Sequence, residues 1–528
     1  MKTKNLKGVA AGLAAVMAAA CVTGCGGGSK SGDLTIYTGV GANITAAGGE
    51  TFNDCLTFQL LEEKTGKHVE WIHPAAGTGA EQFNLMMTSG EYPDAIVYNW
   101  ANATGGTASY VEDGVIVDLT DYIYPTDGSE SCMPNLKKIM DENPDIRRDI
   151  VTDDGRIYVI PYIRLDEALC VFQGPVIRQD WLDKLGLKAP TTPDELYTVL
   201  KAFKTQDPNG NGQADEIPMG GTGGFDNVAG VGPLLWAFGA NYDFQVKDGK
   251  VVYGPTTKEF KEGLEYIAKL YSEGLIDMDY LQDTRSKLDA KFTGDLAGFK
   301  FGFQPTTYYD TMNDGTKKVA GIGYLKAADG ENYCFNPAYT QPVLQSIALA
   351  VTTNNEDPAG TLKWLDELYG GEGLNYANYG KEGDTYTLVD GEPVFTDKVL
   401  KPDNGKTSAN MIALTAAVRD SAFPMGQTWQ FYKQTLAPWG IEAVENWLAD
   451  DANTDGIVPP ITKTAEENER YSSIMNTVKT YMQEEANKVI TGRASVNDWD
   501  KVIAQIKTMG IDEATEIQNA AYQRYLAR

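Results

Sequence analysis

Short apolar runs alternate with amphipathic stretches through most of the chain, and this alternation restricts the fold more than any other feature. The first predicted strands and the helices between them are 34–38, 53–66, 69–72, 79–87 and 94–98. Strand–helix–strand units of this kind build a parallel sheet with right-handed crossovers. The N-terminal part of the chain is therefore predicted to be an open α/β lobe.

The rest of the chain repeats this pattern and becomes mainly helical toward its end. Strand-like pieces at 157–160 and 168–172 flank Pro161 and Tyr162, and we place a crossing between two lobes near them. A buried strand is expected at 346–351. The further predicted helices are 257–273, 358–369, 466–490 and 495–510.

The length and charge of the chain limit both its organisation and its partners. Its 528 residues exceed what one hydrophobic core usually supports, so two domains or lobes are expected. With 73 acidic and 45 basic residues, the net charge is −28. Nucleic acid is excluded as a partner because its binding depends on Lys and Arg that neutralise phosphates, and a strongly anionic ligand is mildly disfavoured.

The N-terminus has the pattern of a bacterial lipoprotein signal. Three lysines precede a short apolar run at 8–20, which is too short to span a bilayer. The small residues before Cys25 resemble a lipobox, and the Gly/Ser-rich segment that follows is typical of a flexible tether. We predict a signal peptide at 1–24, lipidation of Cys25 and a tether within 25–32. An ordinary secretory signal cut elsewhere is the alternative.

Few residue types suited to catalysis or to zinc binding are present. His68 and His73 are the only histidines, which excludes a multi-histidine zinc site and disfavours a Ser-His-Asp triad. The cysteines beyond the signal, which have no metal-like spacing and are interpreted as buried thiols, are Cys55, Cys132, Cys170 and Cys334. No nucleotide or hydrolase motif occurs, although a pair of carboxylates for glycoside hydrolysis stays open among so many acids.

A candidate calcium loop begins at Asp207. Side-chain oxygens recur at alternate positions, a glycine stands at position 6 and an acid at position 9, as a hard cation requires of one short loop. Position 12, an acid in EF-hands, is Pro218, so Glu216 at position 10 would replace it. The predicted ligands are Asp207, Asn209, Asn211, Gln213, Asp215 and Glu216. The alternative is a solvated Asn-Gly turn.

A strongly marked helix leads into this loop. Thr192 is its predicted N-cap, Pro193 its first residue and Glu195 the partner in a capping box. The metal's first role would then be structural, because it would fix the exit of the helix.

Tryptophans are the second group of candidate functional residues in the chain. Those at helical apolar positions are interpreted as core residues. The four in Gly/Pro-flanked sequence, whose rings would be available to stack on the apolar face of a sugar, are Trp100, Trp236, Trp429 and Trp439. Trp100 also follows the 94–98 strand at its carboxyl end, where open α/β sheets bind ligands.

Three segments are similar to the extracellular solute-binding lipoproteins of carbohydrate ABC importers, in the group that includes alginate-oligosaccharide-binding proteins. They are 81–94 (EQFNLMMTSGEYPD), 177–187 (IRQDWLDKLGL) and 200–203 (LKAF), the last running into the calcium loop. The resemblance covers most of the mature chain. In that family the calcium ligands occupy loop positions 1, 3, 5, 7, 9 and 10, and every one of these positions matches in residue type.

The resemblance implies a two-lobe α/β fold of the periplasmic-binding-protein type (type II), with a hinge and a large helical C-terminal portion. The expected lobes are 33–163 with 345–415 and 164–344 with 416–528. By approximate position Trp429 corresponds to a cleft tryptophan, and Arg178 and Tyr308 are further candidates. The resemblance also implies a monomer that binds a structural Ca²⁺ and an oligosaccharide ligand. This monomer would contact ABC membrane subunits and would be held by a lipid anchor on the extracellular face of the membrane.

The mechanism implied is capture of a sugar between the lobes without chemistry. Two alternatives stay open at this point. One is a lipid-anchored glycosidase, whose cleft would share the aromatic residues. The other is a surface protein that binds glycans or peptides and has no permease.

Overall fold

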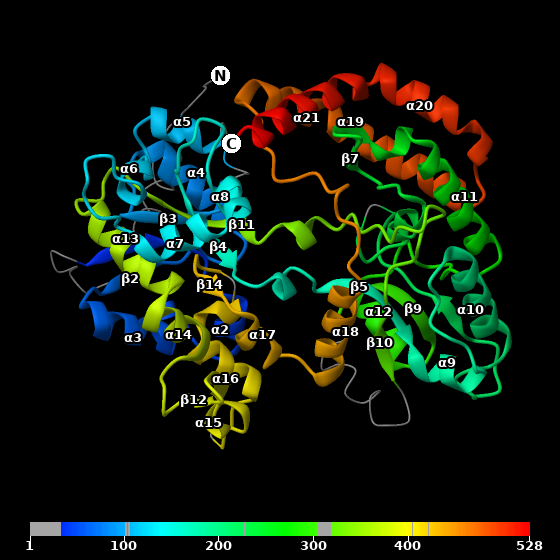
Figure 1. Cartoon of the computed structure of the whole chain (residues 1–528), viewed down its shortest axis with the longest axis horizontal. Coiled ribbons are helices and arrows are strands. Elements are labelled where there is room, and N and C mark those ends of the chain that lie inside the picture. The colour runs from blue at the N-terminus through cyan, green and yellow to red at the C-terminus, as the bar shows by residue number, and fades with distance from the viewer. Residues whose placement is uncertain are drawn as a thin grey trace, which may run out of the picture.

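The computed structural model describes residues 33–100, 103, 106–225, 227–304, 318–403, 405–420 and 422–528. Cys25, the predicted signal and tether, and Tyr308 lie outside these ranges. The described chain forms two α/β lobes that lie side by side and are joined by crossing segments (Figure 1). The two-lobe fold with a large helical C-terminal portion is as the sequence predicts.

The first lobe is built on a sheet that contains six strands of the described chain, in the order β14-β4-β11-β3-β1-β2. β1 pairs in parallel with β2 and β3, whereas β11 runs antiparallel to β3 and β4. The strands are β1 (Leu34–Tyr37), β2 (Val69–Ile72), β3 (Ala95–Tyr98), β4 (Ile160–Arg164), β11 (Val343–Val351) and β14 (Gly426–Gln427).

Helices cover both faces of this sheet, and a small hairpin projects from the same lobe (Figure 1). The early helices are α2 (Ala42–Ala46), α3 (Leu56–Thr65), α4 (Gly79–Ser89), α5 (Gly106–Glu112), α6 (Thr120–Ile123), α7 (Pro134–Glu142) and α8 (Pro144–Ile150). The later elements are α13 (Pro358–Asp366), α14 (Gly371–Tyr379), β12 (Tyr386–Val389), β13 (Glu392–Phe395), α15 (Asp397–Leu400), α16 (Ser408–Thr415) and α17 (Trp429–Lys433).

The second lobe has a smaller sheet, in which four strands of the described chain follow the order β10-β5-β9-β6. Its strands and hairpin are β5 (Gln173–Arg178), β6 (Ile217–Met219), β7 (Phe244–Lys247), β8 (Lys250–Tyr253), β9 (Ala297–Phe303) and β10 (Val319–Gly321). Its helices are α9 (Gln179–Leu185), α10 (Pro193–Thr205), α11 (Lys258–Ser272), α12 (Arg285–Thr293), α18 (Pro438–Ala449), α19 (Ala465–Ile490), α20 (Trp499–Thr508) and α21 (Ile511–Leu526).

One pair of predicted strands is misplaced. The segment 157–160 is mostly irregular and the strand β4 begins only at Ile160, while 168–172 contains the end of a 3-10 turn, Glu167–Leu169. The prediction places a break between two strands at Pro161. Pro161 is tolerated within β4 because it lies where the β4–β11 register is irregular and a backbone N–H is not required.

Hydrophobic contacts assign the C-terminal half of the chain to the lobes. Phe423, Met425 and Phe431 pack into the core of the first lobe, whereas Ala443 and Trp447 pack against strands of the second. The division of the chain into lobes remains a proposal. On these contacts we move its last boundary from residue 415 to about residue 434.

The end of the chain connects the lobes a second time. Helix α21 packs with α19 on the second lobe, and its last turn reaches the first lobe near α8 (Figure 1). Arg524 Nε and Arg528 Nη2 lie 2.9 and 2.6 Å from the Asp153 carboxylate, and the Tyr525 hydroxyl donates to Asp149 Oδ1 at 2.8 Å. These contacts hold the C-terminus to the first lobe.

Asp149 makes this connection sensitive to pH. Its carboxyl group is buried, and burial raises its pKa to about 6, against the opposing effect of Tyr525 and Arg528. The folded state therefore favours the protonated acid, so stability from this group is highest below its unfolded pKa and falls as pH rises toward about 6.

We expect Asp149→Asn to raise the free energy of unfolding by about 2 kcal/mol at about pH 7 and to change it little at about pH 4. Urea denaturation of the variant and the parent at both pH values measures this, with Asp145→Asn, an exposed neighbour, as the control. A loss of stability at the higher pH would contradict it.

Candidate functional site between the lobes

Three segments of the described chain cross between the lobes and are bonded to one another. The first follows β4, the second precedes β11 and the third follows β14. Arg164 N donates to Pro342 O at 2.8 Å, Leu165 N to Gln427 O at 2.9 Å, and Trp429 N to Asp166 Oδ2 at 2.6 Å. These bonds tie the crossings into one hinge.

Two stacked aromatic rings lie between two arginines beside the hinge. The Arg164 guanidinium lies 5.0 Å from the ring centre of Phe172, and the Phe172 ring stacks on the Phe303 ring at 5.8 Å between centres. On the far side, the Arg285 guanidinium lies 4.1 Å from the ring centre of Phe303. Phe172 and Phe303 are both only partly buried. We call this group, together with Trp429, Tyr432, Gln304 and Arg419, the interlobe cluster.

Helix α17 brings aromatic side chains of the first lobe against the second. Trp429 is half-buried and lies 5.9 Å from Tyr432, centre to centre. The Gln304 amide at the end of β9 donates to the Tyr432 hydroxyl at 2.7 Å. This bond crosses from one lobe to the other, so the cluster is formed by both lobes.

The carboxyl ends of β1, β2 and β3 supply polar groups of the first lobe. His73 Nδ1 lies 2.8 Å from the carbonyl oxygen of Thr38, which fixes the proton on that nitrogen. Burial lowers the pKa of His73, so the ring is neutral and its Nε2 is an acceptor. His73 Nε2 and Asn99 Oδ1 are buried without a hydrogen-bond partner among the described residues. Strand ends of this kind are where open α/β sheets bind ligands.

Two of the four predicted sugar-stacking tryptophans are core residues, and their prediction is wrong. Trp100 and Trp236 are each 2% exposed. Trp100 donates to the carbonyl oxygen of Ala348 at 3.0 Å and packs edge-on against Phe83. Trp236 packs against Phe301 in the second lobe. The surrounding Gly-rich sequence suggested loops, but other strands cover both rings.

The other two predicted tryptophans are half-buried. Trp429 belongs to the interlobe cluster, and Trp439 is half-buried in the first turn of α18. No sequence motif marked Phe172, Phe303 or Tyr432. Phe172 directly precedes β5 and Phe303 ends β9, so their positions at strand ends are the one signal that sequence could have supplied, whereas Tyr432 lies within α17.

Arg178 is also a structural residue, so its prediction as a ligand contact is wrong. Its side chain is 1% exposed and makes a bidentate contact to the Asp180 carboxylate at 2.8 and 2.6 Å. A second ion pair joins its Nη1 to Asp295 Oδ1 at 2.5 Å. The guanidinium also lies 4.6 Å over the ring of Trp181. No surface of this side chain is left for a ligand.

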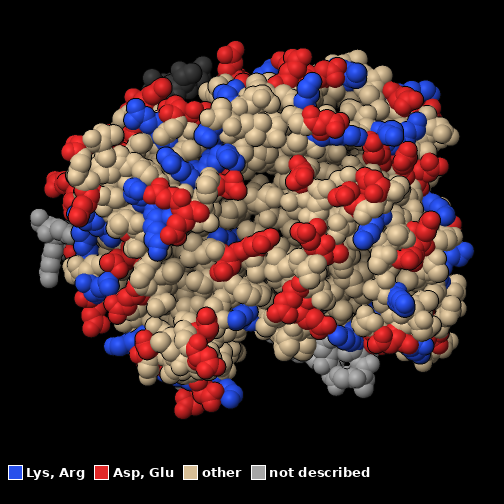
Figure 2. All heavy atoms as spheres, in the orientation of Figure 1, with Lys and Arg blue, Asp and Glu red and all other residues tan. Residues whose placement is uncertain are grey.

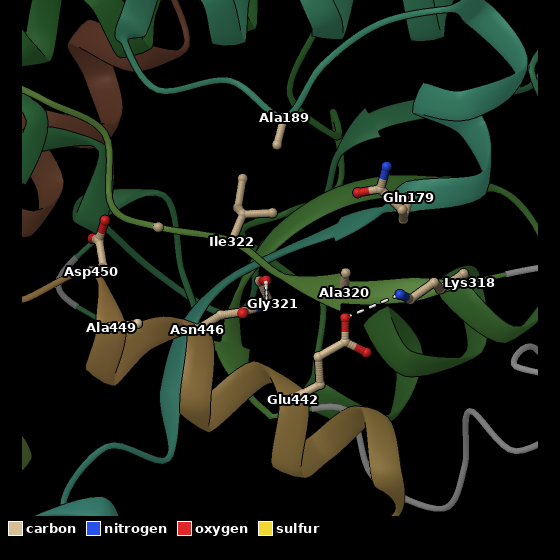
Figure 3. Close-up of a pocket in the computed structure, with 11 residues that line it drawn as sticks. Gln179, Ala189, Lys318, Ala320, Gly321, Ile322, Glu442, Asn446, Ala449 and Asp450 are labelled. Carbon is tan, nitrogen blue, oxygen red and sulfur yellow. Dashed lines mark hydrogen bonds and ion pairs between the residues drawn. The ribbon is translucent and has the colours of Figure 1, made fainter.

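A separate open groove lies on the second lobe between β10 and α18 (Figure 3). Its volume is about 400 Å³. Lys318 pairs with Glu442 at 3.1 Å, and Asn446 donates to the carbonyl oxygen of Gly321 at 3.0 Å. Since its polar groups bond to one another and the first lobe contributes nothing to it, this groove is not the interlobe site.

The candidate calcium loop follows α10, which begins as predicted: Thr192 Oγ1 accepts from Glu195 N at 3.3 Å. Asp207 has a positive φ of 45°, and its carboxylate accepts from the backbone N–H groups of Gly210, Asn211 and Gly212 at 2.9 to 3.1 Å. Asn209 Oδ1 and Asn211 Oδ1 accept from N–H groups two residues on. The loop is therefore folded around its own oxygen atoms.

Three carboxylates of this loop influence one another. Glu216 Oε1 is buried and has no hydrogen-bond partner among the described residues. Burial raises the pKa of Glu216, and the negative charges of Asp207 and Asp215 raise it further. Both amide groups, of Asn209 and Asn211, donate to Asp215. An orphaned carboxylate oxygen beside two further acids fits a cation, because a cation would relieve their repulsion.

The acids alone do not form a closed cage. Within the described ranges, no three His, Cys, Asp or Glu side chains converge closely enough to hold a metal ion. The remaining donors expected here are amide and backbone oxygens, which hard cations accept equally. The residues thus fit calcium in chemical type, and the six-residue ligand set stays a prediction.

The cysteines and the helices bear on two remaining features, disulfides and membrane spans. None of Cys55, Cys132, Cys170 and Cys334 is in a disulfide, a point that the sequence left open. Cys55, Cys170 and Cys334 are buried, whereas Cys132 is half-buried. In the part of the chain that the structure describes, no helix has both the length and the apolar character to cross a membrane.

The two-lobe fold with an interlobe cluster defines a binding protein of the solute-capturing type, and comparison with known families agrees. Residues 38–374 match the family described as bacterial extracellular solute-binding protein, and the chain belongs to this family.

Three relatives span most of the chain. The fructooligosaccharide ABC transporter substrate-binding protein FusA of Streptococcus pneumoniae is 29% identical over 90% of this chain and 88% of its own length. The lipoprotein LipO of Bacillus subtilis is 28% identical over 64% of this chain and 65% of its own length. YtcQ of Bacillus subtilis, a polygalacturonan/rhamnogalacturonan-binding protein, is 24% identical over 67% of both chains.

Solved structures show the same fold. The alginate-binding protein AlgQ2 without calcium ion is 26% identical with a TM-score of 0.68, and FusA in complex with kestose is 25% identical with a TM-score of 0.70. A FusA EF-hand mutant in complex with fructo-nystose matches equally, at 25% and 0.70. Each match covers 94% of this chain and 99% of the other.

Proposed function

We propose that this chain is the extracellular substrate-binding protein of an ABC importer, that it captures an oligosaccharide between its lobes, and that it delivers the sugar to a permease. The observation that carries the proposal is the interlobe cluster, in which partly exposed rings from both lobes flank hydrogen-bonding groups. Aromatic rings stack on sugar faces, and closure is favoured when the ligand contacts both lobes. The sugar-related relatives support this function over a glycosidase or a permease-free surface protein.

The cluster suggests how the sugar would be held. Trp429 and Tyr432 would supply the face of the first lobe, while Phe172 and Phe303 would supply that of the second. His73 Nε2 and Asn99 Oδ1 would accept hydrogen bonds from sugar hydroxyls. Trp439, and Tyr308 outside the described residues, remain candidates from the sequence. Release to a permease requires reopening, so moderate affinity is expected.

A thermal-shift screen against an oligosaccharide panel tests the proposal, because a ligand that binds only the folded state raises the unfolding temperature. Release of shortened sugars during the incubation would overturn it in favour of the glycosidase.

We expect Trp429→Ala to weaken binding of the best sugar about 10-fold or more, as loss of a stacking aromatic anchor does. Isothermal titration calorimetry measures the change. Tyr481→Ala, which removes a half-buried ring on α19 outside the cluster, is the control. Equal affinity of the Trp429 variant and the parent would remove Trp429 from the ligand site.

Two further assignments belong to this proposal. We propose that the 207–216 loop binds a structural Ca²⁺ through Asp207, Asn209, Asn211, Gln213, Asp215 and Glu216, an ion that would neutralise the loop and fix the exit of α10. We also propose that Cys25 carries a lipid anchor at the extracellular face of the membrane, which similarity to the lipoprotein LipO supports. The protein would act as a monomer.

A further inference from the structure

The charge of the interlobe cluster is opposite to that of the chain. The chain carries a net charge of −28, and acidic side chains are spread over the visible face of both lobes (Figure 2). The cluster nevertheless brings together three arginines from three distant segments: Arg164 at the end of β4, Arg285 at the start of α12 and Arg419 in the 3-10 turn that precedes β14.

The three arginines converge on Tyr432. Burial raises the pKa of this phenol, whereas the hydrogen bond with Gln304 and the positive charges of Arg419, Arg164 and Arg285 lower it. The stack on Phe172 and Phe303 fixes two of the three guanidinium groups in place. Arg419 is anchored by its backbone, since its carbonyl oxygen accepts from Asn43 Nδ2 at 3.3 Å just beyond the end of β1.

Local carboxylates do not neutralise this group. Arg285 approaches Asp289 at 3.6 Å, but Asp289 also pairs with Lys300 at 2.9 Å. Asp166 accepts the backbone N–H of Trp429. Arg164 and Arg419 have no carboxylate partner among the described residues. The Arg164 side chain donates to the carbonyl oxygen of Gln341 at 3.3 Å and also bonds to the sulfur of Cys170. The described cluster therefore carries an excess of positive charge.

Such an excess is unfavourable in a partly buried site unless an anion accompanies it. Guanidinium groups bind carboxylates through paired, charge-assisted hydrogen bonds. We propose that the sugar held between the lobes is acidic, a uronate-containing oligosaccharide whose carboxylates are bound by Arg164, Arg285 and Arg419. This inference rests on the proposed function and specifies its substrate class, against the mild expectation drawn from the net charge.

A matched panel tests the inference on the full mature chain: trisaccharides of galacturonate and mannuronate, their methyl esters, and neutral trisaccharides. We expect at least one acid trimer to bind about 10-fold or more tightly than its ester, because each charged hydrogen bond contributes this much. Its affinity should fall several-fold between about 20 and about 200 mM NaCl. An ester or neutral sugar that binds as tightly as the acids would overturn the inference and leave the proposed function standing.

Single substitutions test which arginines bind the carboxylates of the sugar. Arg419→Gln and Arg285→Gln should each lower the ratio of acid to ester affinity about 10-fold, because they remove a charge that only the acid uses. Arg156→Gln removes an exposed arginine paired with Asp118 outside the cluster and should leave both affinities unchanged. The salt dependence of acid binding is measured on the parent protein, so it tests the inference even if a variant folds poorly. Failure of every sugar to bind would overturn the proposed function and this inference together.

Discussion

Arg178→Ala is expected to lower the free energy of unfolding by about 3–5 kcal/mol, since it removes a buried guanidinium and leaves two partly buried carboxylates without their partner. Asp180 and Asp295 both contact this guanidinium, which is 1% exposed. Asp295 also anchors the 207–216 loop, because its carbonyl oxygen accepts from Asn209 Nδ2 at 3.2 Å. The loss should therefore extend from the core of the second lobe to the loop.

Urea denaturation measures this loss, and Arg470→Ala is the matched control. Arg470 makes an equally close bidentate contact, to Glu513 at 2.7 and 2.5 Å, but on the surface. Exposed pairs contribute at most about 1 kcal/mol. Sugar affinity of the folded Arg178 variant should equal that of the parent. A variant that keeps its stability but loses sugar binding would restore Arg178 as a ligand residue.

Calcium is expected to stabilise the protein by about 2.7 kcal/mol at a free concentration 100 times its Kd. The physical reason is the repulsion among Asp207, Asp215 and Glu216, which a bound cation removes. Thermal unfolding of chelator-treated protein, with and without added Ca²⁺, measures the effect.

Single substitutions test whether the calcium effect arises from the 207–216 loop and not from another turn. Glu216→Gln should remove most of the calcium-dependent stabilisation, because it deletes the carboxylate whose oxygen is buried without a partner. Asp455→Asn is the control, since Asp455 lies in an Asx-rich turn whose polar groups bond to Asn453 and Glu331. If chelation leaves the unfolding temperature unchanged, the loop is a self-bonded turn and not a metal site.

Local sequence determined the elements near the calcium loop. Thr192, Pro193 and Glu195 predict the start of α10, and the structure begins the helix at Pro193 with Thr192 as its cap. The strand at 69–72 has its predicted ends, and α11 and α19 lie within a residue of theirs. Caps, turns and apolar spacing act over one or two helical turns, so a sequence carries them without knowledge of the fold.

The site between the lobes depended on contacts that no local pattern contains. Whether a tryptophan is exposed is decided by the chain that packs over it: Trp100 bonds to Ala348, 248 positions away. The stack of Arg164, Phe172, Phe303 and Arg285 joins segments far apart in the chain. Net charge likewise describes the whole surface and not the potential inside one cleft.

The sequence by itself determined the capped helix and the oxygen-rich loop, because these follow from residue types within short segments. Chain length and the family resemblance indicated the two lobes. Only the tertiary structure decided that Trp100, Trp236 and Arg178 are buried and that Arg164 and Arg285, from distant segments, lie over the paired rings of Phe172 and Phe303. The physical reason is that burial and local charge are sums over neighbours in space, and those neighbours are set by how the strands and crossings are joined.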